Sequence, residues 1–263
     1  MSLTNIQSLL RELDMRGALE QFNAYVNNPQ ELEATSIDTI LTNMLTAEQN
    51  TRNKRRQESL IKASRLPVKA ELCMILKDLE RSDPTFINKI DSLSSLEFVE
   101  KCYNLTIYGK AGSGKTFIAS ALGRRNCCLG NSTLYYSTKD IIANLHMNLG
   151  SASYATKLKV ITGKSMLILD DFCLTPYDAD EKSILFDILD KRYGKKSTVI
   201  LSQKSPDAWI DILKGVLMVI HCQNLLLSDA LTIITHLLYQ ALPAVLLLMK
   251  IKSKEHALLK PGE

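Results

Sequence analysis

The sequence predicts an α/β protein in which a parallel sheet flanked by helices follows an all-α N-terminal domain. Over residues 1–66, apolar side chains recur at helical spacing and few β-branched runs compete with a helix. From residue 104 onward, short apolar runs alternate with stretches of helical pattern. Strands that alternate with helices in this way indicate a parallel sheet covered on both faces.

The helical N-terminal domain is predicted to end at residue 66. Its helical pattern covers residues 3–26 and 38–45 and continues through 50–62 with far more charge. Leu66 precedes Pro67, and a residue before proline is pushed out of the α region. Residues 67–103 then form a linker, with helical stretches expected near 72–79 and 93–102.

The α/β core is predicted to span residues 104–213. Its expected strands are residues 104–108, 133–136, 165–169 and 197–201. Its expected helices are residues 117–125, 140–149 and 180–193. Ligands of such sheets bind at the carboxyl ends of the strands, so we expect the chemistry there.

A glycine-rich motif lies between the first of these strands and the helix after it. It fits G-x-x-x-x-G-K-[ST] and consists of Gly109, Lys110, Ala111, Gly112, Ser113, Gly114, Lys115 and Thr116. The glycines let the backbone aim its N–H groups at phosphate oxygens, and the helix adds the positive end of its dipole. Lys115 supplies a charge for the β and γ phosphates, and the Thr116 hydroxyl is the expected Mg²⁺ ligand.

Polar residues follow two further strands. Asp170 is expected to hold Mg²⁺ directly or through water, and Asp171 to orient or deprotonate the water that attacks the γ-phosphate. Gln203, after Ser202, could steady that water or detect the γ-phosphate. The alternatives are a helix cap or loop start for the two aspartates and an ordinary turn for Ser202 and Gln203.

Composition sets limits on the class of protein. With 46% hydrophobic and 23% charged residues, the chain is long enough for a real core, which excludes disorder and collagen. The six cysteines have no C-x-x-C spacing and the four histidines are scattered, so we expect reduced thiols and no zinc site. Residues 1–11 lack the pattern of a signal peptide, and we expect a cytoplasmic protein.

Four segments closely resemble the IstB/DnaC-like AAA+ ATPases, and the resemblance extends from residue 1 to about 213. They are Asn104 to Arg125, Ser165 to Leu174 (SMLILDDFCL), Arg192-Tyr193 and Ser197 to Trp209 (STVILSQKSPDAW). The Ser-Gln followed by Pro and Trp is more similar to the IstB branch, the helpers of insertion-sequence transposases. The resemblance implies a P-loop AAA+ core with Gly109 to Thr116 as Walker A, Asp170 and Asp171 as Walker B and Gln203 as sensor 1.

The resemblance also implies a function: ATP-dependent self-assembly as a homo-oligomer on double-stranded DNA, and recruitment or stimulation of a transposase. A basic stretch gives independent support, since residues 51–69 contain seven Lys or Arg residues against Glu58. Such clusters bind a phosphate backbone with little sequence preference. The alternative is a solvated helix face. The expected DNA-binding residues are Arg52, Lys54, Arg55, Arg56, Lys62 and Arg65.

The sequence departs from this family in two places. Cys173 stands where the family usually has glycine. The family also implies catalytic arginines downstream of Trp209, but no arginine follows Arg192, which predicts nucleotide binding with impaired hydrolysis.

Residues 214–263 form an atypical apolar segment. Of the 35 residues from Gly215 to Met249, 24 are apolar and Asp229 alone is charged. Three interpretations stay open: an out-of-frame translation product, a divergent buried lid, or a membrane anchor at Leu231 to Met249. We favour the first and expect no membrane partner.

Two alternative functions of the protein also stay open: a helicase loader in DNA replication, and a hydrolysis-deficient, ATP-switched DNA-binding module.

Overall fold

In the computed structural model, which describes residues 3–74, 84–213 and 231–234, the chain divides into two units between Leu60 and Ile61. This boundary falls inside α4 (Ile37–Ala63), so one long helix contributes to both units. Each unit has its own cluster of buried apolar side chains, and the two are described separately below.

The first unit is all-helical, as predicted. It contains α1 (Leu3–Glu12), α2 (Arg16–Asn27), α3 (Pro29–Ala34) and most of α4. Asp14 adopts a left-handed backbone (φ 49°), which divides the helical stretch of residues 3–26 into α1 and α2. The buried core consists of Leu10, Ala18, Phe22 and Met44.

A buried carboxylate joins α2 to α4 within this unit. Oε2 of Glu48 accepts the N–H groups of Gly17 (2.9 Å) and Ala18 (3.3 Å), and Oε1 accepts Nε of Arg52 (2.6 Å). Gly17 lets the two helices approach closely, because a Cβ there would lie 2.4 Å from the carbonyl oxygen of Ala47. Glu48 therefore caps the N-terminus of α2 from a neighbouring helix.

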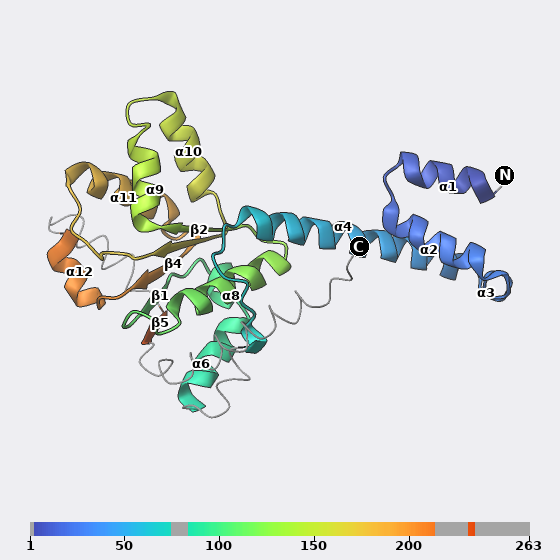
Figure 1. Cartoon of the computed structure of the whole chain (residues 1–263), viewed down its shortest axis with the longest axis horizontal. Coiled ribbons are helices and arrows are strands. Elements are labelled where there is room, and N and C mark those ends of the chain that lie inside the picture. Colours follow the sequence, from blue (N-terminus) through green and yellow to red (C-terminus); the bar gives the residue numbers. More distant parts are fainter. Residues whose placement is uncertain (1–2, 75–83, 214–230, 235–263) are drawn as a thin grey trace, which may run out of the picture. The chain divides into compact units, whose positions relative to one another are not determined.

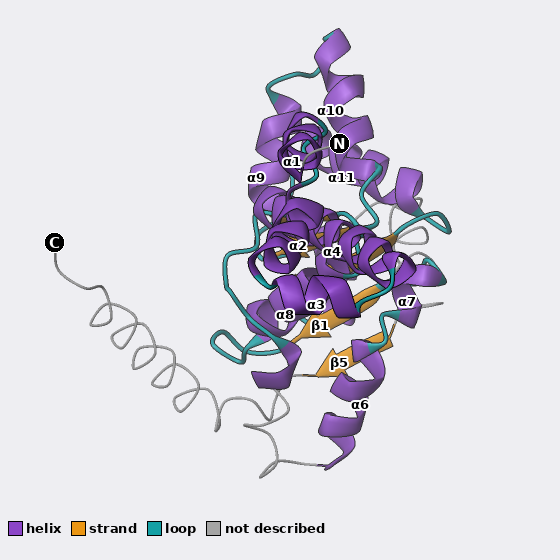
Figure 2. Cartoon of the chain, turned by 90° about the vertical axis from the view of Figure 1, so that its right-hand side faces the viewer, coloured by secondary structure: helices purple, strands orange, loops and turns teal. Residues whose placement is uncertain are grey.

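The second unit is built on a parallel sheet with the strand order β2-β3-β4-β1-β5 (Figures 1 and 2). The four strands predicted from the sequence are confirmed, with ends shifted by one residue. β5 was not predicted and pairs with β1 at one edge. The strands are β1 (Leu105–Tyr108), β2 (Thr133–Ser137), β3 (Met166–Asp170), β4 (Ser197–Ser202) and β5 (Leu231–Ile234).

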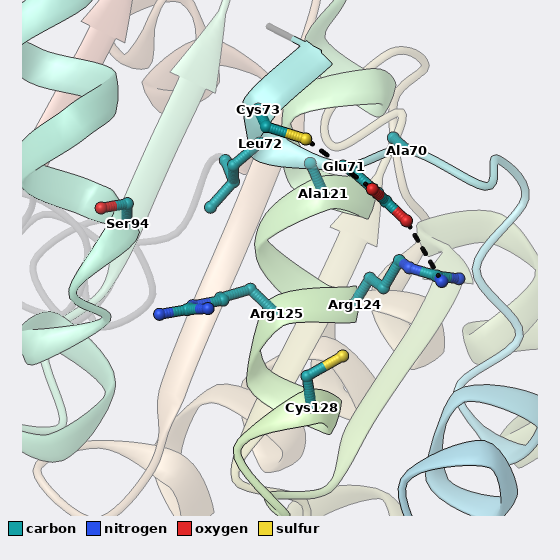
Figure 3. A pocket seen from close by; sticks show the side chains of 9 residues that line it. All are labelled: Ala70, Glu71, Leu72, Cys73, Ser94, Ala121, Arg124, Arg125 and Cys128. Carbon is teal, nitrogen blue, oxygen red and sulfur yellow. Dashed lines mark hydrogen bonds and ion pairs between the residues drawn. The ribbon is translucent and has the colours of Figure 1, made fainter. Parts of the chain in front are cut away.

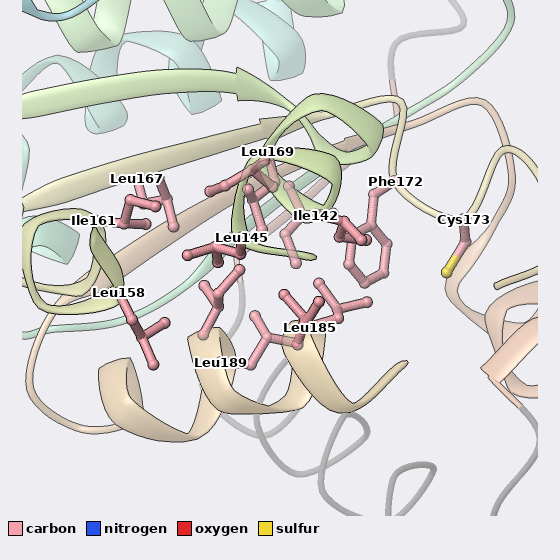
Figure 4. Close-up of a cluster of buried hydrophobic side chains, with 14 of the residues drawn as sticks. Ile142, Leu145, Leu158, Ile161, Leu167, Leu169, Phe172, Cys173, Leu185 and Leu189 are labelled. Atoms are coloured by element: carbon pink, nitrogen blue, oxygen red, sulfur yellow. The ribbon is translucent and has the colours of Figure 1, made fainter. Parts of the chain in front are cut away.

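Helices cover both faces of this sheet. On one face, α6 (Pro84–Ser94), α7 (Glu97–Glu100) and α8 (Lys115–Cys128) contribute to a core with Ile107, Ile168 and Leu201. On the other face lie α9 (Thr138–His146), α10 (Ala152–Thr162), α11 (Ala179–Arg192) and α12 (Pro206–Leu213). Figure 4 shows this second core, in which leucines of α10 and α11 pack toward Leu167 and Leu169 of β3.

Several helical predictions failed, and α6, α10 and α12 were not predicted. The stretch expected at 93–102 is interrupted, because Leu96 takes a left-handed backbone (φ 59°) between α6 and α7. α10 was missed, although Tyr154, Leu158 and Ile161 have the spacing of one helix face. None of the helices within the described ranges is long and apolar enough to cross a membrane. Of the segment considered as a membrane anchor, Leu231–Ile234 form β5 and the rest lies outside the described residues.

Candidate functional site

The loop after β1 is shaped by glycines in the left-handed region. Gly112 (φ 77°) and Gly114 (φ 83°) turn the chain into α8, which begins at Lys115. No atom lies within 4 Å of a Cβ added at Gly112, so its requirement for glycine is conformational. Gly109 donates its N–H to the carbonyl oxygen of Ser202 (3.2 Å), which ties the loop to the end of β4. A loop of this shape at a helix N-terminus can hold phosphate oxygens.

The side chain of Lys115 folds back into this loop. Its Nζ donates to the carbonyl oxygens of Gly109 (2.9 Å) and Lys110 (2.8 Å). Burial lowers the pKa of Lys115, while the carboxylates of Asp170 and Asp171 oppose that shift. The loop thus holds a buried ammonium group at its centre, with carbonyl partners that a phosphate could replace.

The structure brings Thr116 and Asp170 together. Thr116 donates its hydroxyl to Oδ2 of Asp170 (2.8 Å), and the N–H of Asp171 donates to Oδ1 (2.8 Å). Both side chains offer the hard oxygens that Mg²⁺ prefers. No group of three His, Cys, Asp or Glu side chains in the described ranges could hold a metal. Mg²⁺ at this place would therefore take its other ligands from phosphate and water.

Tyr135, which sequence reasoning missed, is a further partner of Asp170. Its hydroxyl donates to Oδ2 of Asp170 at 2.6 Å. Burial and this bond both raise the pKa of Tyr135, so the phenol stays a protonated donor. The available signal was strand alternation, because Tyr135 and Tyr136 must point to opposite faces of the sheet.

Asp171 is exposed at the start of a tight turn and adopts a left-handed backbone (φ 53°). Cys173 is also left-handed (φ 54°), and its N–H donates to the Tyr177 hydroxyl (2.9 Å). A left-handed backbone favours glycine, which explains physically why this position is usually glycine in the family that the sequence resembles.

Ser202 and Gln203 have different environments. Ser202 is buried, donates its hydroxyl to the carbonyl oxygen of Phe172 (2.7 Å) and accepts Nε1 of Trp209 (3.1 Å). Phe172 and Trp209 pack edge to face at 4.9 Å between ring centroids. Ser202 therefore connects the ends of β3 and β4 to α12, whereas the Gln203 side chain is exposed just beyond β4.

The basic residues expected to bind DNA fall in both units. In the first, Arg52 pairs with Glu48 (2.6 Å) and Arg55 lies 3.5 Å from Asp14. In the second, the guanidinium of Arg65 stacks over the ring of Tyr136 (4.9 Å to the centroid) and donates to its hydroxyl. Lys54, Arg56 and Lys62 are exposed.

Figure 3 shows a cavity of about 470 Å³ in the second unit. It is formed by the last turns of α8, residues 70–73 and Ser94 of α6. Arg124 in its wall already pairs with Glu71 (3.4 Å). No residue of the motif Gly109 to Thr116 lines this cavity.

Comparison with known families identifies the chain. Residues 8–229 match the family described as IstB-like ATP binding protein. The chain belongs to this family. The match reaches past residue 213, where the resemblance seen in the sequence stopped. As a family member, the chain is an IstB-like ATP-binding protein.

Individual relatives agree with this assignment. An insertion sequence ATP-binding protein of Sinorhizobium fredii is 30% identical over 77% of this chain and 80% of its own length. The insertion sequence IS1162 ATP-binding protein of Pseudomonas fluorescens is 32% identical over 64% of this chain and 72% of its own. A crystal structure of DnaI superposes with a TM-score of 0.52 at 19% identity, over 63% of this chain and 90% of that one, and shows the shared fold.

Proposed function

We propose that this IstB-like protein assembles with ATP as a homo-oligomer on double-stranded DNA and recruits or stimulates a transposase. The observation that carries the nucleotide part is the geometry in which Lys115 fills the loop while Thr116 meets Asp170 at 2.8 Å. The relatives are named as ATP-binding proteins of insertion sequences, which supports a role in transposition.

Each residue of the site has a proposed role. The loop Gly109 to Thr116 cradles the phosphates, and Lys115 replaces its two carbonyl partners with β and γ phosphate oxygens. Thr116 and Asp170 would hold Mg²⁺, which would supply positive charge to offset the negative charge on the phosphates. Asp171 accepts a proton from the attacking water or orients it, and Gln203, exposed beyond β4, contacts the γ-phosphate as sensor.

Hydrolysis is proposed to be weak. An arginine that completes an ATP site contributes about 10³ to 10⁵ in rate in other phosphoryl-transfer systems. No arginine follows Arg192 in this chain, and Arg192 itself is buried with its guanidinium bonded to Thr198 and to backbone carbonyls. The second candidate function, an ATP-switched DNA-binding module without efficient turnover, follows from this feature.

Residues 214–263 are proposed to include out-of-frame sequence. The apolar composition and the loss of arginine support this, although Leu231–Ile234 pair with β1 as an extra strand. Translation of the other two frames downstream of about codon 212 tests the proposal. Recovery of Asp-Arg and Ser-x-Arg motifs there would support it, and their absence would contradict it.

The proposed function is tested by ATP turnover with and without duplex DNA, together with sizing of the protein in ATP. We expect ATP to promote assembly on DNA, with turnover below that of a full-length relative. Lys115→Ala should abolish nucleotide binding and assembly, whereas Asp171→Asn should retain both. Failure of ATP to change assembly would contradict the proposal, and selective capture of a replicative helicase would favour the helicase-loader alternative.

A further inference from the structure

A second concave surface lies beside β2, the edge strand of the sheet. It is a groove of about 380 Å³ lined by residues from the end of α4, β2, α9 and α10. Leu134 and Tyr136 form its floor, on the face of the sheet opposite to Tyr135. The groove is therefore separate from the phosphate-binding loop.

Three cations line the groove and no acidic residue does. They are Arg65, Lys157 and Lys164. Neither lysine side chain has an ion pair within the described ranges, and the remaining polar lining side chains are neutral: Asn144, Thr156 and Tyr136. Unpaired positive charge in a concave surface attracts an anion.

Three hydrogen bonds to backbone carbonyl oxygens hold the two walls of the groove in place. Arg65 is left-handed (φ 58°), and the segment before it is pinned to β2, because the N–H of Tyr135 donates to the carbonyl oxygen of Ser64 (2.8 Å). On the other wall, the buried Arg192 donates to the carbonyl oxygens of Thr162 (2.9 Å) and Lys164 (2.8 Å). Hydrogen bonds therefore anchor the backbone beside Arg65 and at Lys164.

The larger cavity at the end of α8 differs in this respect. Its Arg124 is paired with Glu71, so part of its positive charge is already neutralised. The groove beside β2 keeps its lysine charges, and its three cations and neutral polar side chains, set among apolar residues, suit an extended polyanion. Lysine and arginine side chains together with neutral donors are typical contacts of a sugar-phosphate backbone.

We infer that the groove formed by Arg65, Lys157 and Lys164 binds the phosphodiester backbone of DNA. This inference rests on the proposed function, since duplex DNA is the proposed partner, and it adds a site on the ATPase unit to the basic residues of α4. Contacts of this kind position DNA without reading its bases.

The test compares two variants that each lose two positive charges. Lys157→Ala with Lys164→Ala removes the groove lysines, and Lys159→Ala with Lys195→Ala removes exposed lysines outside it. Affinity for a labelled duplex of arbitrary sequence is measured by fluorescence anisotropy, from about 50 to about 200 mM salt. We expect the groove variant, but not the control variant, to bind the duplex more weakly. The slope of log affinity against log salt concentration should fall in magnitude by about one for each lysine removed.

Thr156→Glu supplies a second variant, because it adds a negative charge to the same groove at an exposed helix position. It should also weaken DNA binding while ATP affinity stays unchanged. Equal losses in the groove and control double variants, or no loss in the groove variants, would overturn the inference and leave the proposed function standing. If the wild-type chain did not bind duplex DNA at all, both would be overturned.

Discussion

Tyr135 and Tyr136 are neighbours in β2 with entirely different partners. Tyr135 donates to the Asp170 carboxylate beside the phosphate-binding loop, and Tyr136 carries the stacked guanidinium of Arg65. The alternation of a strand puts one ring on each face of the sheet. Two adjacent residues therefore contact the nucleotide site and the basic groove.

Tyr135→Phe is predicted to weaken Mg²⁺ binding at the nucleotide site. The change removes a donor that holds Oδ2 of Asp170, and a hydrogen bond to a charged group contributes at least about 1.5 kcal/mol, roughly tenfold in affinity. Titration of Mg²⁺ into protein with a fluorescent ATP analogue measures it. Tyr136→Phe is the matched control, and an equal effect of both changes would show that Tyr135 does not position Asp170.

At the scale of the element, α2 depends on a cap from another helix. Met15 precedes α2 and has no side-chain cap, so the buried Glu48 of α4 accepts the N–H groups of Gly17 and Ala18 instead. Burial alone would raise the pKa of Glu48, but the bonds from Arg52 and from these two amides lower it overall. The ionised carboxylate therefore stabilises the first unit.

Glu48→Gln is predicted to destabilise the first unit by about 1 to 3 kcal/mol at neutral pH. Because the folded pKa of Glu48 is depressed, its contribution is complete above the unfolded value of about 4.3 and is lost as pH falls through the folded pKa. Denaturant unfolding followed by circular dichroism across this acidic range measures both effects. The exposed Glu33→Gln is the control, and equal stability of the two variants would contradict the capping role.

At the scale of the whole molecule, each unit has its own core, but only the second unit contains a tryptophan. Trp209 is the single tryptophan of the chain and is buried against Phe172 in the second unit. Its fluorescence therefore reports on the second unit, whereas circular dichroism reports on helices of both units.

Mg·ATP is predicted to shift the unfolding transition detected by Trp209. A ligand at about 100 times its Kd stabilises the state that binds it by roughly 2.7 kcal/mol. The shift should be large in Trp fluorescence, while the part of the circular dichroism signal that comes from the first unit stays in place. Lys115→Ala should abolish the shift. If fluorescence and circular dichroism instead gave one coincident transition, and Mg·ATP shifted both equally, the two units would unfold together and the prediction would be contradicted.

Much of the fold could be predicted because its signals are local. Apolar runs between helical patterns indicated four strands, and the glycines that precede Lys115 indicated the loop between β1 and α8. α10 was missed because its four large apolar side chains alternate with lysines, threonines and small residues, which weakens the pattern. β5 was missed because a short apolar run within a long apolar segment has no boundary in the sequence.

The sequence by itself determined the family, four of the five strands in their order along the chain, and the glycine-rich loop between β1 and α8. These depend on residue type and spacing within a few turns. Only the tertiary structure decided that Tyr135 holds Asp170, that Glu48 caps α2 and that Lys157 and Lys164 share a groove with Arg65. Apart from the two lysines, which are close in sequence, each of these pairings joins residues at least 30 positions apart. Such side chains meet only when helices and strands pack against one another, so local sequence spacing could not predict them.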